Sequence, residues 1–154
     1  MRWISIGLWL ALTFAVAGIS ARWTAAEIPA WYRTLVRPAI APPNWVFGPV
    51  WSLLYALMAI AAWRVSVAPP SSPRNLALIL FLVQLALNFA WSWLFFKQHA
   101  LGAALAEVML LWVTIAVTTL AFARIESLAA WLMAPYLAWV TFATVLNGAF
   151  WRAN

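Results

Sequence analysis

Cysteine is absent from this chain, and other ionisable side chains are scarce. The 154 residues include no cysteine, three acidic residues and a single histidine, His99. The absence of cysteine excludes disulfides, thiol catalysis and thiolate-bound metals. No general acid–base pair, activated nucleophile or metal-ligand cluster is visible among so few groups. The sequence therefore gives little support to ordinary enzymatic chemistry.

Charge is also scarce, because 8% of the residues are charged and 68% are hydrophobic. This composition lies far outside that of soluble domains, so the chain is expected to reside in a bilayer. Backbone groups in lipid must be hydrogen-bonded internally, and the apolar runs lack the alternation of barrel strands, so each run is predicted to be a helix. The expected fold is all-α, a single five-helix transmembrane domain over residues 1–154. Five stretches are long enough to cross about 30 Å of hydrocarbon: residues 3–22, 45–64, 75–96, 101–123 and 128–151.

The net charge of +6 raises the question of nucleic acid, since nine residues are basic. These residues are scattered at the ends of the expected spans and form no stripe, so no nucleic-acid partner is expected and anchoring at lipid headgroups explains them better. The orientation in the membrane stays open, because the two sides carry similar numbers of basic residues. They are Arg2, Arg64, Arg74 and Arg124 on one side, and Arg22, Arg33, Arg37, Lys97 and Arg152 on the other.

The first connection is much longer than the others and is predicted to be a lid loop over residues 24–44. Pro38, Pro42 and Pro43 disfavour helix there and reduce the conformational entropy that is lost on ordering. The remaining connections are short, which favours antiparallel neighbouring helices in a compact bundle.

Thirteen tryptophans are present, and about half are explained as anchors at the membrane surface. The expected anchors stand in pairs at the ends of spans: Trp3 and Trp23, Trp45 and Trp63, Trp131 and Trp151. Of the other tryptophans, several fall with polar residues on single helix faces, in the half of the membrane nearest the lid. These faces carry Trp51 and Tyr55; Gln84, Asn88, Trp91 and Phe95; and Tyr136, Trp139, Ala143 and Asn147.

Amide side chains are poorly tolerated facing lipid, so these faces should point inward and form an aromatic cavity under residues 31–51. Alternatively, the amides tie helices together, at about 0.6 kcal/mol per pair on average, and the aromatic rings fill a core. The sequence leaves both interpretations open. Glu107, the one acidic residue inside an expected span, could reach the membrane surface, pair with a lid arginine or be protonated.

Four ordered motifs resemble the translocator protein or tryptophan-rich sensory protein family (TspO/MBR, also called peripheral-type benzodiazepine receptors). The first is Trp31-Tyr32 followed by Leu35, Pro38 and Pro42-Pro43. The others are WVFGPVWSLLY (residues 45–55), QLALNFAWSWLFF (84–96) and PYLAWVTFATVLN (135–147). The resemblance covers nearly the whole chain. It implies a five-helix membrane protein, often a homodimer, that binds porphyrins and other flat lipophilic molecules beneath the first loop.

By position, the resemblance implies a lid containing Trp31, Tyr32 and Pro42. The pocket would be lined by Trp51, Asn88, Trp139, Ala143 and Asn147. The implied function is a receptor or sensor for tetrapyrroles that aids their transport or takes part in stress-linked regulation. The alternative is light-dependent porphyrin degradation, with Trp51 and Trp139 as the photochemical residues.

The ligands expected for this chain are fewer than those that the resemblance to the family implies. No obligatory cofactor is expected, and metal-free porphyrin fits better than ligated haem, because His99 is expected in an exposed turn. Arg33 and Arg37 could meet a propionate at the cavity mouth. Sterol binding is doubtful, since Gly148 stands where animal members carry a tyrosine of a proposed cholesterol motif. Which membrane holds the protein is open, with a bacterial cell envelope favoured.

Overall fold

The described secondary structure is entirely helical. The computed structural model describes residues 2–154, with side chains from Ser5 onward, so the predicted anchor Trp3 has no described side chain. Five segments are long and apolar enough to cross a membrane, which confirms the predicted all-α architecture for the described residues. The five long helices are α1 (Arg2–Ala30), α2 (Phe47–Ser66), α3 (Ser72–Ser92), α4 (Leu101–Ala123) and α5 (Ser127–Ala153).

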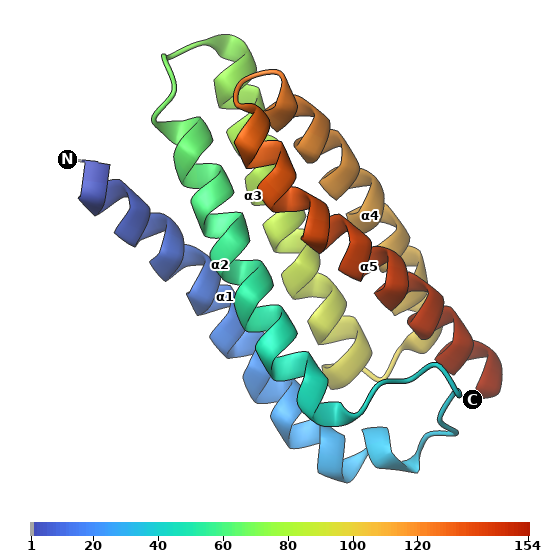
Figure 1. The fold of residues 1–154 in the computed structure, drawn as a ribbon. Helices are drawn as coiled ribbons and strands as arrows, with labels where there is room; N and C mark the ends of the chain where they lie inside the picture. The colour runs from blue at the N-terminus through green and yellow to red at the C-terminus, as the bar shows by residue number, and fades with distance from the viewer. Residues whose placement is uncertain (1) are drawn as a thin grey trace.

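The helices form one bundle with α1 at its edge (Figure 1). α1 packs mainly against α2, α2 also contacts α5, and α4 contacts both α3 and α5. The two ends of the chain lie at opposite ends of the bundle. The end that holds residues 31–46, the α3–α4 turn and the C-terminus is called the connector end below.

The predicted loop over residues 24–44 is wrong in its first part, because α1 continues as helix through Ala30. The prediction ended this helix at the last residue of the apolar run. Hydrophobicity determines which part of a helix lies in the hydrocarbon of the membrane, but a helix can continue beyond that part. Residues 23–28 contain no helix breaker, and Pro29 lies only in the last turn. The connector that remains contains two short 3-10 turns, Tyr32–Thr34 and Asn44–Val46.

Specific contacts hold this connector against the bundle. The backbone N–H of Val36 donates to Oδ1 of Asn154 at 2.8 Å, and Nδ2 of Asn154 donates to the Val36 carbonyl at 3.2 Å. The Arg37 guanidinium donates to the Pro42 carbonyl, and Tyr32 is buried. The C-terminus thus fixes the segment that lies over the candidate site.

Small side chains let the helices approach closely in the core. Ala59, Ala61 and Ala62 on α2 are fully buried, as are Ala77 on α3 and Ala129 on α5. In lipid the hydrophobic effect does not drive one helix toward another, so van der Waals packing at such small residues supplies much of the attraction.

Glu107 on α4 does not pair with an arginine of the connector. Both of its carboxylate oxygens are buried and have no hydrogen-bond partner among the described residues. One of the three alternatives for this residue, the ion pair with the lid, is therefore excluded. A carboxyl group without a polar partner inside a bundle is costly, which explains why the spans contain so few.

At the end opposite the connector, an ion pair joins α2 to the α4–α5 turn. The guanidinium of Arg64 donates to both carboxylate oxygens of Glu126, with Nη2 to Oε1 at 3.1 Å. This hydrogen bonding lowers the pKa of Glu126 below its ordinary value, and the backbone amides of Leu128 and Ala129 act in the same direction.

Glu126→Gln is expected to lower the free energy of unfolding at pH 7 by at most about 1 kcal/mol, because both partners are partly exposed and screened. A carboxyl whose folded pKa is lowered stabilises the fold above its unfolded pKa, and this contribution disappears as the pH falls through the folded pKa. Denaturant unfolding in detergent should therefore show a smaller difference at about pH 3 than at pH 7. Arg124→Gln, in the same turn, is the control, and an equal loss at both pH values would contradict the assignment.

Candidate functional site

The larger of two cavities at the connector end has a volume of about 320 Å³. This volume lies within the range of about 300 to 1,000 Å³ that is usual for small-molecule sites. Its walls come from α1, the start of α2 and the end of α3. They combine aromatic rings with the hydroxyls of Ser20, Thr24, Ser52 and Ser92. The lining residues are Ala17, Ser20, Ala21, Thr24, Ala25, Ile28, Asn44, Phe47, Gly48, Trp51, Ser52, Tyr55, Trp91, Ser92 and Phe96.

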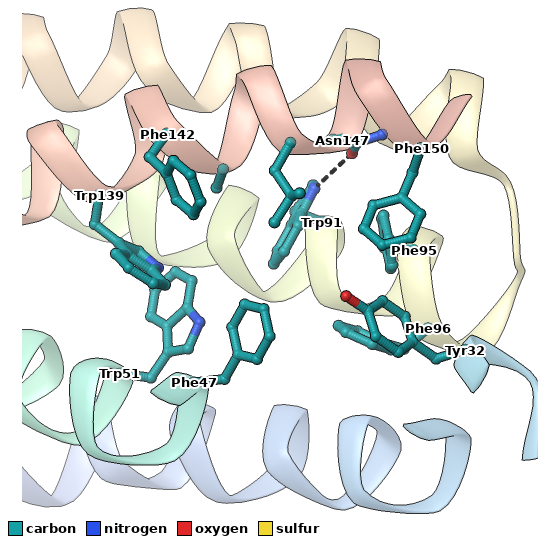
Figure 2. A pocket seen from close by; sticks show the side chains of 12 residues that line it. Tyr32, Phe47, Trp51, Trp91, Phe95, Phe96, Trp139, Phe142, Asn147 and Phe150 are labelled. Atoms are coloured by element: carbon teal, nitrogen blue, oxygen red, sulfur yellow. Dashed lines mark hydrogen bonds between the residues drawn. The ribbon is translucent and has the colours of Figure 1, made fainter. Parts of the chain in front are cut away.

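A second, smaller cavity of about 30 Å³ adjoins the first, and most of its lining residues are aromatic. Figure 2 shows rings from α2, α3, α5 and the connector converging on it. Its volume holds no more than about one or two water molecules. Its lining residues are Tyr32, Phe47, Trp51, Trp91, Phe95, Phe96, Trp139, Phe142, Ala143, Leu146, Asn147 and Phe150. Phe47, Trp51, Trp91 and Phe96 line both cavities and form the partition between them.

Trp51 is the centre of the aromatic cluster. Its ring centroid lies 6.3 Å from that of Trp91, 6.5 Å from that of Trp139 and 5.7 Å from that of Tyr55. Tyr136 lies 6.3 Å away in an edge-on arrangement. These separations fall within the range of about 4.5 to 7 Å at which aromatic pairs attract each other. One side chain on the first turns of α2 thus connects the walls supplied by α3 and α5.

The orientation of Trp91 is set by two hydrogen bonds through Asn147. Nε1 of Trp91 donates to Oδ1 of Asn147 at 3.1 Å (Figure 2), and Nδ2 of Asn147 donates to the Leu101 carbonyl at 2.9 Å. Asn147 on α5 therefore joins α3 to the first turn of α4. Because these hydrogen bonds satisfy the indole N–H, the face of Trp91 is left for packing.

A π-helical turn at Trp93–Lys97 follows α3 and turns two neighbouring rings toward the cavities. Its defining hydrogen bond runs from the Gln98 N–H to the Trp93 carbonyl at 3.0 Å. Phe95 and Phe96 both line the smaller cavity, although consecutive residues of a regular helix point about 100° apart. Such turns are frequent at functional sites.

Asn88 and Gln84 lie deeper on α3 and line neither cavity. Asn88 accepts a hydrogen bond from the Tyr55 hydroxyl and donates to the Tyr136 hydroxyl at 2.9 Å, so it joins three helices. The nearest polar contact of Gln84 is a weak one from Nε2 to Sδ of Met58 at 3.9 Å. The hydrogen bonds of Asn88 link helices, as in the alternative that the sequence left open, whereas Oε1 of Gln84 is buried without a partner among the described residues.

The predicted lid residues have different positions. Tyr32 lines the smaller cavity, and burial raises the pKa of its hydroxyl while the nearby Arg37 opposes the shift. Trp31 and Pro42 line neither cavity. The guanidinium of Arg37 donates one hydrogen bond to the Pro42 carbonyl within the connector. Its other N–H groups are not used in this contact, so the predicted contact with a propionate stays a prediction.

Most of the residues predicted from sequence meet at this site. Trp51, Tyr55 and Trp91 line the larger cavity, and Tyr32, Trp51, Trp91, Trp139, Ala143 and Asn147 line the smaller one. Trp31, Pro42, Gln84 and Asn88 do not reach either cavity.

Several lining residues were missed, including Asn44, Phe47, Gly48, Ser52, Ser92 and Phe96, together with two groups that each share one helix face. Phe142, Leu146 and Phe150 share the α5 face with Trp139 and Ala143, so helical spacing could have found them. The wall from α1 was also missed, although its members recur at helical spacing: Ala17, Ser20, Ala21, Thr24, Ala25 and Ile28. Small residues in a membrane helix normally indicate helix contact, so this pattern did not point to a cavity.

Among the described residues, no three or more His, Cys, Asp or Glu side chains gather into a group that could hold a metal ion. The arrangement can enclose an apolar planar molecule between rings and can offer it a few hydroxyls. It presents no pair of groups suited to acid–base catalysis along the cavity walls.

Comparison with known proteins agrees with this architecture. The chain is 37% identical over 152 residues to "Tryptophan-rich protein TspO" of Chlorobaculum tepidum, covering 98% of this chain and 96% of that protein. It is 38% identical over 138 residues to "Translocator protein" of Homo sapiens, covering 88% and 82%. It is 41% identical over 124 residues to "Tryptophan-rich sensory protein" of Cereibacter sphaeroides, covering 80% and 77%.

The sequence profile of the TspO/MBR family matches residues 9–152, which include all five membrane-spanning segments in most of their length. The matched region contains every residue that lines the two cavities. With five apolar helices, the chain is an integral multi-pass membrane protein. It belongs to the TspO/MBR family.

Proposed function

We propose that this protein is a membrane receptor or sensor that binds porphyrins and other flat lipophilic molecules in the larger cavity. The cavity of about 320 Å³ beside the Trp51–Trp91 pair carries the proposal. A planar ring system gains burial of its apolar area there. It also gains about 0.5 to 1.5 kcal/mol for each favourable aromatic contact beyond that burial. The names of two relatives, a sensory protein and a translocator, are consistent with ligand recognition or movement.

The polar groups of the cavity suit a ligand with a few hydrogen-bonding substituents. Ser52 and Ser92 belong to walls from different helices, and Ser20 and Thr24 lie on α1 opposite them. Hydroxyls can donate or accept, so they accommodate several ligands without the cost of burying a charge. This favours a receptor for a class of lipophilic molecules. Metal-free porphyrin is favoured over haem, and no obligatory cofactor is part of the proposal.

A light-dependent activity is the second candidate, and the ring cluster around Trp51 favours it. Trp51 lies within 6.5 Å of both Trp91 and Trp139, measured between ring centroids. One of these indoles would give an electron to a photoexcited porphyrin, so that the indole is oxidised and the porphyrin is reduced. The proposed residues are Trp51 and Trp139, as the sequence predicted.

The proposed setting is a bacterial cell envelope, with the protein as a homodimer. Gly102 on α4, a small residue of the kind that favours close helix contact, faces Trp151 of the same chain, since a Cβ at this position would lie 2.9 Å from Nε1 of Trp151. This glycine is therefore not offered as a contact between two chains. Sterol is not among the proposed ligands, because Gly148 packs against Leu105 and carries no side chain to recognise one.

Titration of purified protein with protoporphyrin in the dark, followed by quenching of tryptophan fluorescence, tests the binding proposal. Trp51→Ala is expected to weaken the affinity about tenfold, because several ring contacts and their burial disappear together. Trp131→Ala is the matched control, since this indole is 73% exposed and lies away from the cavities. Equal affinities of wild type and Trp51→Ala, or no saturable quenching, would contradict the proposal. A new absorbing product that forms only under illumination, and not in Trp51→Phe, would support the second candidate.

A further inference from the structure

At the connector end, the single histidine takes part in a cluster that joins the end of α1 to the α3–α4 turn. Nε2 of His99 lies 2.9 Å from Oε2 of Glu27 on α1. The imidazole stacks on the indole of Trp31, with centroids 4.0 Å apart and planes 10° from parallel. Trp31 in turn meets Phe95 edge-on, at 5.9 Å. As the sequence predicted, His99 is exposed and lies in the turn between α3 and α4. The three residues Glu27, Trp31 and His99 are called the His99 latch below.

We propose that the His99 latch is a proton-controlled closure of the ligand cavity, held shut when His99 is protonated and released when it is neutral. The proposal concerns regulation of the same site and rests on the proposed function for its effect on porphyrin. The closure itself is a property of the protein alone and can be measured without a ligand.

The latch lies where it can control access to both cavities. Glu27 follows Thr24 and Ala25 and precedes Ile28, and all three line the larger cavity. Trp31 precedes Tyr32, which lines the smaller one. The contacts of the latch therefore attach the wall made by α1 and the start of the connector to the α3–α4 turn. When the latch opens, the end of α1 loses its polar tie to α3, and the cavity wall can move outward.

A proton on His99 strengthens both contacts of the latch. An imidazolium forms an ion pair with the Glu27 carboxylate, whereas the neutral ring offers only a hydrogen bond. A cation above an indole face is also attracted by the ring quadrupole, and the Trp31 ring is parallel to the imidazole at contact distance. The ion pair and the cation–ring contact exist only while the imidazole carries a proton, so the closed state is favoured at low pH and loses this advantage as the pH rises.

Other charged groups near the latch do not replace His99 in this role. Arginine and lysine side chains keep their charge between about pH 5 and 8. Burial raises the pKa of the Tyr32 hydroxyl, so it stays neutral in this range. The carboxylate oxygens of Glu107 on α4 are buried and have no hydrogen-bond partner among the described residues. The titratable and charged residues on the elements that meet here are Arg22 and Glu27 on α1, Tyr32 and Arg33 in the 3-10 turn, Lys97 in the π-helical turn, and Glu107 on α4.

Two substitutions remove the proton-dependent contacts with little local damage. His99 has a φ of 54°, in the left-handed region where asparagine is tolerated better than most residues. His99→Asn therefore suits the backbone and cannot be protonated. Glu27→Gln keeps a hydrogen-bond acceptor on α1 but removes the charge. Both variants are expected to fold and to lose the pH dependence.

The first experiment measures closure without ligand. The chain contains no cysteine, so spin labels can be placed at Arg33→Cys and Lys97→Cys without other changes. Pulsed electron paramagnetic resonance should give a narrow distance distribution at about pH 5.5 and a broader, longer one at about pH 8. In the His99→Asn background the broad distribution is expected at both pH values. A distribution that does not change with pH in wild type, or that changes equally in His99→Asn, overturns the latch.

The second experiment measures association of protoporphyrin by stopped-flow quenching of tryptophan fluorescence. Wild type is expected to bind about three- to tenfold more slowly at about pH 5.5 than at about pH 8. His99→Asn should bind at the fast rate at both pH values, and this comparison removes any effect of titration of the ligand. An equal pH dependence in both proteins overturns the control of access. If no porphyrin binds to either protein, the proposed function fails, and the spin-label distances still decide whether the latch exists.

Discussion

Replacing Gly48 by phenylalanine is expected to weaken porphyrin binding by about a hundredfold while the protein stays folded. Gly48 lies in the first turn of α2 and lines the larger cavity. A Cβ built at this position meets no atom within 4 Å, and the backbone φ is not positive, so a side chain causes no local strain. The added benzyl group then occupies the space proposed for the ligand. Fluorescence titration with protoporphyrin in the dark measures the loss.

Two further variants separate blocking of the cavity from general damage. Ala21→Phe blocks the same cavity from α1 and should weaken binding in the same way. Gly18→Phe places the same side chain on α1 at a position that is exposed and open, and it lines neither cavity. It should bind porphyrin like wild type. Wild-type affinity in both Gly48→Phe and Ala21→Phe would show that the ligand binds elsewhere.

Asn88→Leu is expected to lower the free energy of unfolding by about 2 to 4 kcal/mol. Asn88 is 1% exposed and pairs with the hydroxyls of both Tyr55 and Tyr136. Leucine leaves these two buried hydroxyls without their partner, at about 1 to 3 kcal/mol each. Measured pair energies in membrane bundles are smaller on average, which places the expectation below the sum of two full penalties. Unfolding in detergent by increasing denaturant measures the change.

A triple variant provides the control for Asn88. If the loss arises from unpaired hydroxyls, adding Tyr55→Phe and Tyr136→Phe to Asn88→Leu should restore much of the stability, because no polar group is then left without a partner. Porphyrin affinity of the folded Asn88→Leu protein should change by less than about threefold, since Asn88 lines neither cavity. Unchanged stability together with a large loss of affinity would instead place Asn88 in the binding site. The resemblance of the sequence motifs to the family implies that position for Asn88.

Helical spacing correctly predicted which helix faces point into the bundle. It did not predict which residues of those faces line a cavity. Gln84, Asn88 and Trp91 share one face of α3, yet only Trp91 reaches the cavities. Spacing reports the direction of a side chain around its helix. Whether that direction ends in a cavity or in another side chain depends on the residues of the opposing helices. Here Met58, Tyr55 and Tyr136 fill the space beside the two amides.

The residue at which α1 ends and the connector begins was also not predictable from the sequence pattern. The hydrophobic run predicted that the first span ends near residue 22, whereas α1 continues to Ala30. The extra turns carry Thr24, Ala25 and Ile28 into the cavity wall and Glu27 into the latch. No local pattern linked Glu27 to His99, because the two residues are 72 positions apart.

By itself the sequence determined that this protein is a bundle of five membrane-spanning helices of the TspO/MBR family. It also determined that Trp51, Trp91 and Trp139 face inward. The bundle follows from the cost of exposing charges or unpaired backbone groups to lipid, which depends on composition and length. The inward faces follow from the helical spacing of tryptophans with amides, and the family follows from the resemblance of four ordered motifs. Only the tertiary structure decided where the cavity lies, that α1 forms one of its walls, and that His99 pairs with Glu27. A cavity is the volume that side chains from several helices fail to fill, so no single segment of sequence contains it.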